Sequence, residues 1–470
     1  MFKQSSKLLL VLVSLTGASQ AASHMQADSD NYHSGGKTTA FVDGRHAFTQ
    51  PAKNMSIERR VEFSVGNNFF KSPWVIAPSS TTARDGLGPL YNATSCRSCH
   101  VNNGRGKAPD IGNKTAVSAL LRLSIPATTP AHQELVQYLG VVPEPNYGTQ
   151  FQDMAIPGVL PEGKVRVDYS YENVSFDDGT VVELRKPNIQ LQALNYGALH
   201  PDTQFSLRLA RPMIGLGLLE AIAEADILAQ ENPDDQRGDG ITGRANRVWD
   251  QETQTVQLGR FGWKAGKASL REQNADAFIQ DLGLTSELRP KSNCMPKQTE
   301  CASAPNGGEP EIIANIEQKL LFFTRTLAVP ARRNLTDEKV VQGAILFRRT
   351  GCVNCHTPSF TTRQDAAEPE LAGQKIYPYT DLLLHDMGEG LADNRPEFLA
   401  TGSEWRTPPL WGIGLTEIVH GHTEFLHDGR ARNLLEAVLW HGGEAETAKQ
   451  RVLGFNQEQR EALLAFLNSL

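Results

Sequence analysis

The sequence predicts a mainly α-helical protein of two domains, with a small β-hairpin inserted in the first domain. Residues 57–70 and 311–329 carry apolar side chains at helical spacing. Residues 165–184 instead alternate apolar and polar side chains on both sides of a turn, as a strand pair does. The motif Cys-x-x-Cys-His occurs once in each half, at 96–100 and at 352–356, which indicates two related units.

The ends of the helices in the second half follow from their capping residues. The helix at 311–329 should end at Pro330, because proline removes a helical hydrogen bond. We expect the next helix to begin with Thr336 as N-cap and to run directly into Cys352. Asn456 is expected to cap a C-terminal helix. The boundary between the two units is therefore predicted near residue 330.

The hairpin prediction depends on one alternating segment and one turn. Val165, Val167, Tyr169 and Tyr171 alternate with other residues, and the turn Asp177-Asp178-Gly179 follows. An Asp-Gly turn between such runs is a strong local signal for a hairpin. Because the segment lies inside the first helical unit, we interpret it as an insertion.

The N-terminus predicts export. Residues 1–22 combine Lys3 and Lys7, an apolar run at 8–13 and small residues at 17–22, which is the plan of a signal peptide. A buried helix is the alternative interpretation. An extended arm at 23–55, a first domain at 56–329 with the motif at 96–100 and a second at 330–470 with the motif at 352–356 would follow it. No later stretch is long and apolar enough to span a membrane, so we expect a periplasmic protein without a stable membrane anchor.

The overall charge gives no support for a nucleic-acid partner. The chain has 46 Lys and Arg against 53 Asp and Glu, which gives a formal net charge of −7. Its basic residues do not gather in a run or stripe of the kind that contacts phosphates. DNA and RNA are therefore not expected to bind.

The two Cys-x-x-Cys-His motifs predict two covalently bound haem c groups. Two thiols add to the two vinyl groups of one porphyrin, and the adjacent histidine becomes an axial ligand of the iron. A zinc site would need four ligands close together, and a thioredoxin-type pair would need a βαβ context. The predicted haem-binding residues are Cys96, Cys99, His100, Cys352, Cys355 and His356.

The remaining two cysteines, Cys294 and Cys301, lie in a loop rich in Pro and Ser. In an oxidising compartment they are expected to form a local disulfide. A free or catalytic thiol pair is the alternative.

An internal repeat extends beyond the haem motifs. Pro212–Glu220 resembles Pro409–Glu417, with both glycines in register. Residues 261–270 align with 425–434, which sets Trp263 against His427. Coincidence among glycine-rich loops is the alternative explanation.

These motifs resemble the bacterial di-haem cytochrome c peroxidases and their relatives that mature methylamine dehydrogenase. The most similar group is a di-haem oxidoreductase subfamily, and the resemblance rests on both haem motifs, the Trp263 segment and residues 211–222, 383–388, 406–414 and 425–445. It covers roughly residues 50–470. It implies a mostly helical fold and the reduction of peroxide.

For the second haem, the resemblance implies a distal ligand shortly after the segment His427-Asp428-Gly429. His441 falls at that position, so we predict that His356 and His441 both bind this iron. The resemblance also implies that His427 and Arg430 contact a haem propionate. Other side chains could supply the ligand instead, namely Met387, His385, His420 and His422, and His441 could merely cap a helix.

For the first haem, the repeat sets Ala277 opposite His441, so this iron is expected to have an open distal face. His132 or His200 could still fill that face. The resemblance places Gln273 near the distal cavity and makes Trp263 a relay between the haems, although plain packing would also explain Trp263. The catalytic glutamate of the family has no match, because Gly283 stands there.

Glu220 is the best substitute for that glutamate, and a structural role for it is equally compatible with the sequence. The leading hypothesis is a peroxidase-like enzyme in which electrons pass from the second haem to the first. Its partners would be a small redox protein as electron donor and hydrogen peroxide as substrate. A non-catalytic electron-transfer protein and an enzyme that oxidises a partner protein are the alternatives, and bound calcium is an open question.

Overall fold

The computed structural model describes residues 30–111 and 117–470, so the predicted signal peptide at 1–22 lies outside the described residues. The described chain is 30% helix and 19% strand in several small sheets, a mixed α/β fold. The prediction of a mainly α-helical protein was therefore wrong. Most of the strands have only two to six residues, which is too short for an alternating pattern to show in the sequence.

The α-helices are α2 (Ile57–Lys71), α3 (Cys96–Cys99), α4 (Pro130–Leu139), α5 (Leu216–Glu220), α6 (Glu224–Leu228), α7 (Leu270–Asp281), α8 (Thr299–Ala302), α9 (Ala314–Thr326), α10 (Glu338–Arg349), α11 (Thr416–His420), α12 (Leu434–Leu439), α13 (Glu446–Leu453) and α14 (Gln457–Ser469). Among the residues that the structure describes, no helix is long and apolar enough to cross a membrane. Asn456 caps α14 as predicted, and its side chain and that of Gln459 form a capping box. The expected N-cap at Thr336 was one residue off, because the Asp337 carboxylate accepts the hydrogen bonds at the start of α10.

The strands are β1 (Leu90–Tyr91), β2 (Ala119–Ser124), β3 (Gln150–Phe151), β4 (Met154–Ala155), β5 (Lys164–Ser175), β6 (Val181–Gln192), β7 (Gln204–Leu209), β8 (Arg247–Asp250), β9 (Thr255–Leu258), β10 (Phe360–Thr361), β11 (Lys375–Ile376), β12 (Leu384–Asp386) and β13 (Glu404–Arg406). Strands β3, β2 and β7 form a three-stranded antiparallel sheet in that order. The other strands pair two by two, all antiparallel: β1 with β4, β5 with β6, β8 with β9, β10 with β11, and β12 with β13.

Each half of the chain contains a pair of crossing helices, α2 with α9 and α10 with α14. Both pairs cross at a glycine, since a Cβ at Gly66 would lie 2.2 Å from the Lys319 carbonyl oxygen and one at Gly343 would lie 1.9 Å from that of Ala462. Each pair also presents a phenylalanine to the histidine of the local Cys-x-x-Cys-His motif, at 6.1 Å between ring centroids in both halves. The two halves therefore surround their motifs with the same packing.

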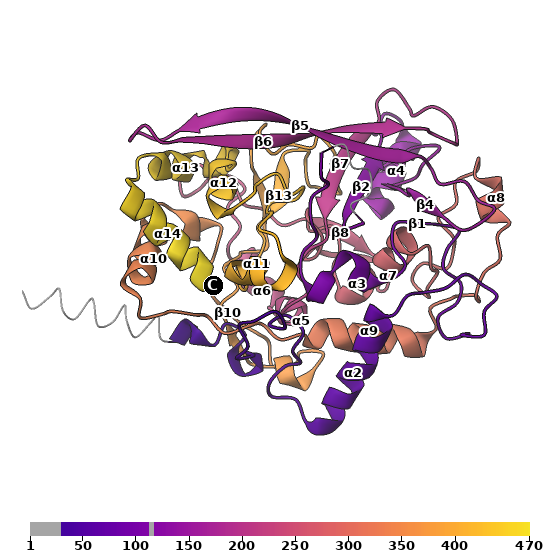
Figure 1. Ribbon diagram of the computed structural model, residues 1–470, viewed down its shortest axis with the longest axis horizontal. Helices are drawn as coiled ribbons and strands as arrows, with labels where there is room; N and C mark the ends of the chain where they lie inside the picture. The colour runs from indigo at the N-terminus through magenta and orange to yellow at the C-terminus, as the bar shows by residue number, and fades with distance from the viewer. Residues whose placement is uncertain (1–29, 112–116) are drawn as a thin grey trace, which may run out of the picture.

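The predicted hairpin is confirmed and is longer than expected. Strands β5 and β6 pair over twelve residues each, from Lys164 opposite Gln192 to Ser175 opposite Val181. Figure 1 shows this ribbon running across the molecule from the elements of the first half to α12 and α13 of the second. At its tip Asp178 pairs with Arg460 at 2.7 Å, and the Arg460 guanidinium lies over the Phe176 ring. The hairpin thus ties the two halves together.

Candidate functional site

The internal repeat predicted from the sequence is confirmed by the backbone. Gly215 and Gly412 both have left-handed φ angles, 68° and 73°, immediately before a short helix. In the second repeated segment the bridge between Phe261 and Lys267 matches the bridge between Phe425 and Ala431, 164 residues later in the numbering. Helices α7 and α12 then begin at equivalent positions, each behind a polar N-cap. Ala277 therefore aligns with His441, although α7 continues to Asp281 whereas α12 ends at Leu439, before His441.

The first Cys-x-x-Cys-His motif lies on the wall of a cavity of about 460 Å³. Cavities that hold cofactors and other small molecules have volumes of about 300–1,000 Å³. The wall combines α3, which carries the two cysteines, with α7, the β2–β7 sheet and the segment that follows β7. We call it the N-terminal cavity.

The second motif lies on the wall of a separate cavity of about 300 Å³, which we call the C-terminal cavity. Cys352, Cys355 and His356 line it together with His441. Apolar side chains from α12, α13 and α14 cover much of the remaining wall, which suits the flat apolar body of a porphyrin. The four motif cysteines carry free thiols, and the structure thus leaves them available for thioether bonds.

The two motif histidines are oriented in the same way. The Nδ1 atom of His100 donates to the carbonyl oxygen of Arg211 at 2.8 Å, and that of His356 donates to the carbonyl oxygen of Tyr379 at 3.0 Å. Such a bond fixes the ring of a metal-binding histidine and leaves Nε2 for the metal. Burial lowers the pKa of both rings to about 4, so both are neutral, as an iron ligand must be.

His441 has the same arrangement as the motif histidines. Its Nδ1 donates to the carbonyl oxygen of Ala437 at 2.7 Å, and burial lowers its pKa. It lies close enough to His356 to contribute to the lowered pKa of that ring. These features fit the predicted pair of axial ligands, which stays a prediction.

Of the alternative ligands in the second half, His385 is the least suitable. Its Nε2 bonds to Asp381 at 2.8 Å and its Nδ1 to Glu444 at 2.7 Å, so both nitrogens are already occupied. Although burial opposes protonation, Asp381 raises the pKa of His385 well above its usual value. Met387 lines the C-terminal cavity, whereas His420 and His422 are not among the described residues that line either cavity.

The two cavities differ at the position where a second protein ligand of the iron is predicted. Ala277 lines it at the position equivalent to His441, and alanine has no atom that binds iron. His132 lies on α4 with its ring at Thr128, and the His200 ring is exposed beside Asp202. Neither histidine is among the described residues of this cavity wall.

The predicted catalytic residues separate into two groups. Gln273 lines the N-terminal cavity, one turn of α7 before Ala277. Glu220 does not line it, because its carboxylate is used for structure: one oxygen accepts from the backbone N–H of Leu270 at 2.8 Å and the other pairs with Arg325 at 2.7 Å. These contacts fit the structural role for Glu220 that the sequence left open beside the catalytic one.

Trp263 is one of the few side chains that line both cavities. Its indole N–H donates to the Leu209 carbonyl oxygen at 2.9 Å, and the guanidinium of Arg211 lies 5.3 Å from its ring. The His427 ring stacks on Trp405 at 3.8 Å and meets Trp263 edge to face. A conjugated ring held between the two cavities fits a relay for electrons.

The predicted propionate contacts differ in their surroundings. His427 lines the C-terminal cavity. Arg430 is not part of the described wall, because its guanidinium is held by Asp428 at 2.7 Å and by the Gly390 carbonyl oxygen, and it covers the Trp440 ring. The guanidinium of Arg430 is thus already bonded within the protein.

Three other arginines, which were not predicted from the sequence, point to an anionic ligand. Arg105, Arg211 and Arg406 line the C-terminal cavity, and Arg211 lines both cavities. Each has a buried guanidinium nitrogen without a hydrogen-bond partner in the described structure. Burial and the neighbouring cations lower the pKa of Arg211 well below its usual value. Unpaired buried cations need an anion, and haem propionates at the edges of both cavities would supply it. Arg211 and Arg406 lie next to the two repeated segments, and this position is the feature of the sequence that could have indicated them.

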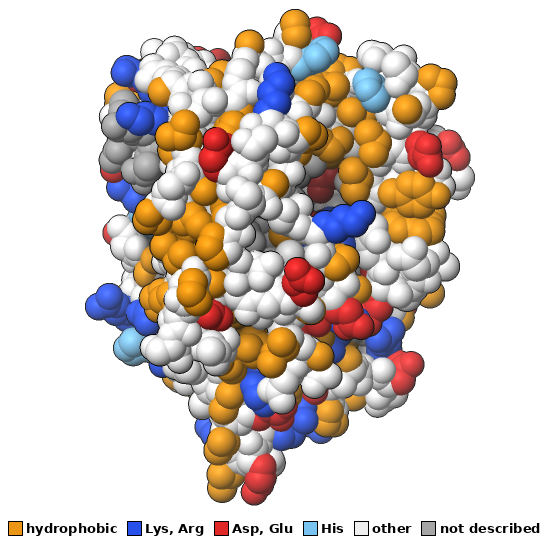
Figure 2. All heavy atoms as spheres, turned by 90° about the vertical axis from the view of Figure 1, so that its right-hand side faces the viewer, with side chains coloured by type: hydrophobic (Ala, Val, Ile, Leu, Met, Phe, Trp, Pro, Cys, Tyr) orange, Lys and Arg blue, Asp and Glu red, His pale blue; other side chains and the backbone are white. Residues whose placement is uncertain are grey.

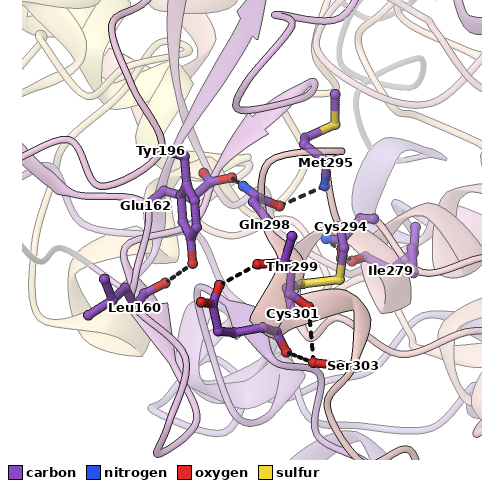
Figure 3. The surroundings of a disulfide bond; sticks show 12 residues. Leu160, Glu162, Tyr196, Ile279, Cys294, Met295, Gln298, Thr299, Cys301 and Ser303 are labelled. Atoms are coloured by element: carbon purple, nitrogen blue, oxygen red, sulfur yellow. Dashed lines mark hydrogen bonds between the residues drawn. A yellow bond between two sulfur atoms is a disulfide. The ribbon is translucent and has the colours of Figure 1, made fainter.

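The predicted disulfide is confirmed and supports the N-terminal cavity. Cys294 and Cys301 are bonded, with 5.8 Å between their Cα atoms. Figure 3 shows Ile279 of α7 beside Cys294, and Gln298 between Glu162 and the backbone of Met295. Met295 also lines the N-terminal cavity. The loop closed by the disulfide therefore packs against the helix that forms the cavity wall.

The question of bound calcium stays open. Among residues 30–111 and 117–470 no group of three or more His, Cys, Asp or Glu side chains could hold a metal ion. The residues of the two cavities fit haem, by contrast, in their free thiols, neutral histidines and unpaired arginines.

Comparison with known proteins agrees with this arrangement. Residues 28–470 match the model of the family described as "Di-haem oxidoreductase, putative peroxidase". The chain is also 24% identical over 260 residues to a cytochrome c551 peroxidase of Nitrosomonas europaea, an alignment that covers 49% of this chain and 70% of the relative. No solved structure matches the chain with significance.

Proposed function

Because the chain belongs to the di-haem oxidoreductase family, which implies haem c as cofactor, we propose that it is an exported enzyme that reduces peroxide. Electrons would enter at the C-terminal cavity from a small redox protein, pass through Trp263 and be used in the N-terminal cavity. A bound haem supplies an iron that carries single electrons when both axial positions are filled and that binds peroxide when one face is open.

The observation that carries this proposal is the difference between two otherwise equivalent cavities. The C-terminal cavity has a neutral histidine, His441, in addition to His356. The N-terminal cavity has Ala277 at the equivalent place. This difference supports a division in which one centre only transfers electrons and the other binds substrate.

The chain itself would hold both cofactors. Cys96, Cys99, Cys352 and Cys355 would provide the thioether bonds, with the adjacent histidines as ligands. Arg105, Arg211 and Arg406 would bind the propionates through their unpaired N–H groups. Buried charge-assisted bonds of this kind also fix the orientation of a bound group.

Periplasmic location is supported by the predicted signal peptide and by the disulfide, since disulfides persist in oxidising compartments. The relative named as a cytochrome c551 peroxidase supports peroxide as substrate and a small cytochrome as donor.

The test uses the matured holoprotein. We expect its oxidised spectrum to contain one high-spin and one low-spin haem, and a reduced c-type cytochrome to be oxidised when peroxide is added. Ala277→His is the matched variant, because it places in the N-terminal cavity the ligand that the C-terminal cavity has. It should remove the high-spin signal and the turnover. A wild-type protein that stays low-spin after one-electron reduction and reduces no peroxide would favour a non-catalytic electron-transfer protein.

A further inference from the structure

One face of α7 forms part of the N-terminal cavity and carries the carboxyl group of Asp281. Gln273, Ala277 and Asp281 follow one another at intervals of four residues, so they lie along the same side of the helix. All three line the N-terminal cavity. Asp281 is thus one turn beyond Ala277, the position of the open face. Figure 2 shows the face of the molecule that is on the right in Figure 1, where α7 and α8 lie. This face is hollowed near its centre.

The Asp281 backbone is held firmly while its side chain has few partners. Its carbonyl oxygen accepts from the backbone N–H groups of Asn92 and Ala93, which ties α7 to the segment before the first haem motif. Among the described residues, a single hydrogen bond reaches the carboxylate, from Gln150 Nε2 to Oδ1 at 2.8 Å. The Gln150 side-chain oxygen is itself buried without a partner. The second carboxylate oxygen, Oδ2, is therefore left for another group.

The charges around Asp281 leave its proton affinity high. Burial raises its pKa to about 6, against the opposing effects of Arg122 on β2 and the Gln150 bond, and Asp276 adds to the increase. The thiols of Cys96 and Cys99 on α3 also interact with it. Filling the cavity with a porphyrin would remove more water and convert these thiols to uncharged thioethers.

A second carboxyl group on α7, Asp276, lies in the opposite environment. Although burial opposes it, Lys267 at 3.4 Å, Arg289 at 3.5 Å and Arg122 at 4.0 Å lower the pKa of Asp276 to about 2. Asp276 therefore stays ionised and holds the basic side chains of the cavity wall. Two carboxyl groups in one cavity with pKa values moved apart are a frequent sign of divided acid–base roles.

We propose that Asp281 carries the proton between the two oxygens of a peroxide bound in the N-terminal cavity, an inference that rests on the proposed function. The ionised carboxylate takes the proton from one peroxide oxygen and delivers it to the other. The O–O bond then breaks, and the second oxygen leaves as water together with the electron pair of that bond. Two electrons from the donor protein and two protons from solvent complete the conversion of one peroxide to two waters, and Asp281 returns to its ionised form.

The test combines a spectroscopic titration with kinetics. In the wild-type holoprotein, the infrared band of a protonated carboxyl group should disappear between about pH 5 and about pH 7, and Asp281→Asn should lack this band. The same variant should lower kcat/KM for hydrogen peroxide about 10²–10⁴-fold, the usual contribution of a proton-transfer group, with an unchanged haem spectrum. Asp281→Glu should recover part of the rate. Asp202→Asn, at an exposed aspartate, is the matched control and should behave as wild type.

The two proposals fail in different ways. If the wild type reduces no peroxide, the proposed function is wrong. If the wild type reduces peroxide and Asp281→Asn is equally fast, the function stands and the assignment of Asp281 is wrong. Absence of the titrating band from the wild type would also overturn it, without requiring any variant to fold.

Discussion

His385 gives the most quantitative prediction about the second cavity. Its ring is 2% exposed and bonds at 2.8 Å to Asp381 and at 2.7 Å to Glu444. It also lies 3.6 Å from the sulfur of Cys355, and Glu444 in turn accepts two bonds from Thr242. This network connects the second haem motif to the loop before β8.

Replacing His385 by leucine would leave two buried carboxylates without their shared cation. Breaking a buried ion pair costs about 3–5 kcal/mol. In the variant, the Asp381 carboxylate would still accept a hydrogen bond from the backbone N–H of Leu383, and that of Glu444 one from Asp386. We therefore expect the lower end of that range, a loss of about 3 kcal/mol in the free energy of unfolding. The assay is equilibrium urea unfolding of the holoprotein, with His46→Leu at an exposed histidine as the control, which should change stability by about 0.5 kcal/mol or less.

The pH dependence provides an independent check. Because the pKa of His385 is raised in the folded state, its contribution is fully present below its unfolded value of about 6.5. That contribution is lost as the pH rises through the folded value. The stability difference between wild type and His385→Leu should therefore shrink at alkaline pH. A difference below about 1 kcal/mol at neutral pH, or one that grows with pH, would refute the ion-pair reasoning.

Three further predictions concern the cofactors and their surroundings. His441→Ala should convert the second haem from low-spin to high-spin, as its absorption spectrum would show; an unchanged low-spin spectrum would exclude His441 as the ligand. Trp263→Leu should slow electron transfer between the haems and leave both haem spectra unchanged. Stopped-flow reduction would measure the rate, and an unchanged rate would mean that Trp263 serves only in packing. Thiol counting on the unfolded holoprotein should find no free cysteine, and two reactive thiols would contradict the Cys294–Cys301 bond.

The sequence was most informative where one short pattern fixes a geometry. The repeat alone aligns Ala277 with His441, and matching bridges and helix starts confirm that register. Helices with strong apolar spacing, such as α2 and α9, were also predicted within a few residues.

The sequence was least informative where a role depends on contacts between distant segments. For Glu220 the sequence leaves a catalytic and a structural role open, and its ion pair with Arg325, about a hundred residues later, is visible only in the structure. Arg211 and Arg406 each keep an unpaired nitrogen because the folded chain brings no acceptor close to it in the described structure. A local sequence pattern does not contain this information. The pKa of Asp281 depends in the same way on the burial of a helix end.

The central claim is that each half of this chain holds one covalently bound haem. Mass spectrometry of the matured protein, intact and after digestion, tests it most directly. We predict an added mass of two haem groups, one on the peptide with Cys96 and Cys99 and one on the peptide with Cys352 and Cys355. Unmodified cysteines in both peptides of a fully matured, exported preparation would contradict the account.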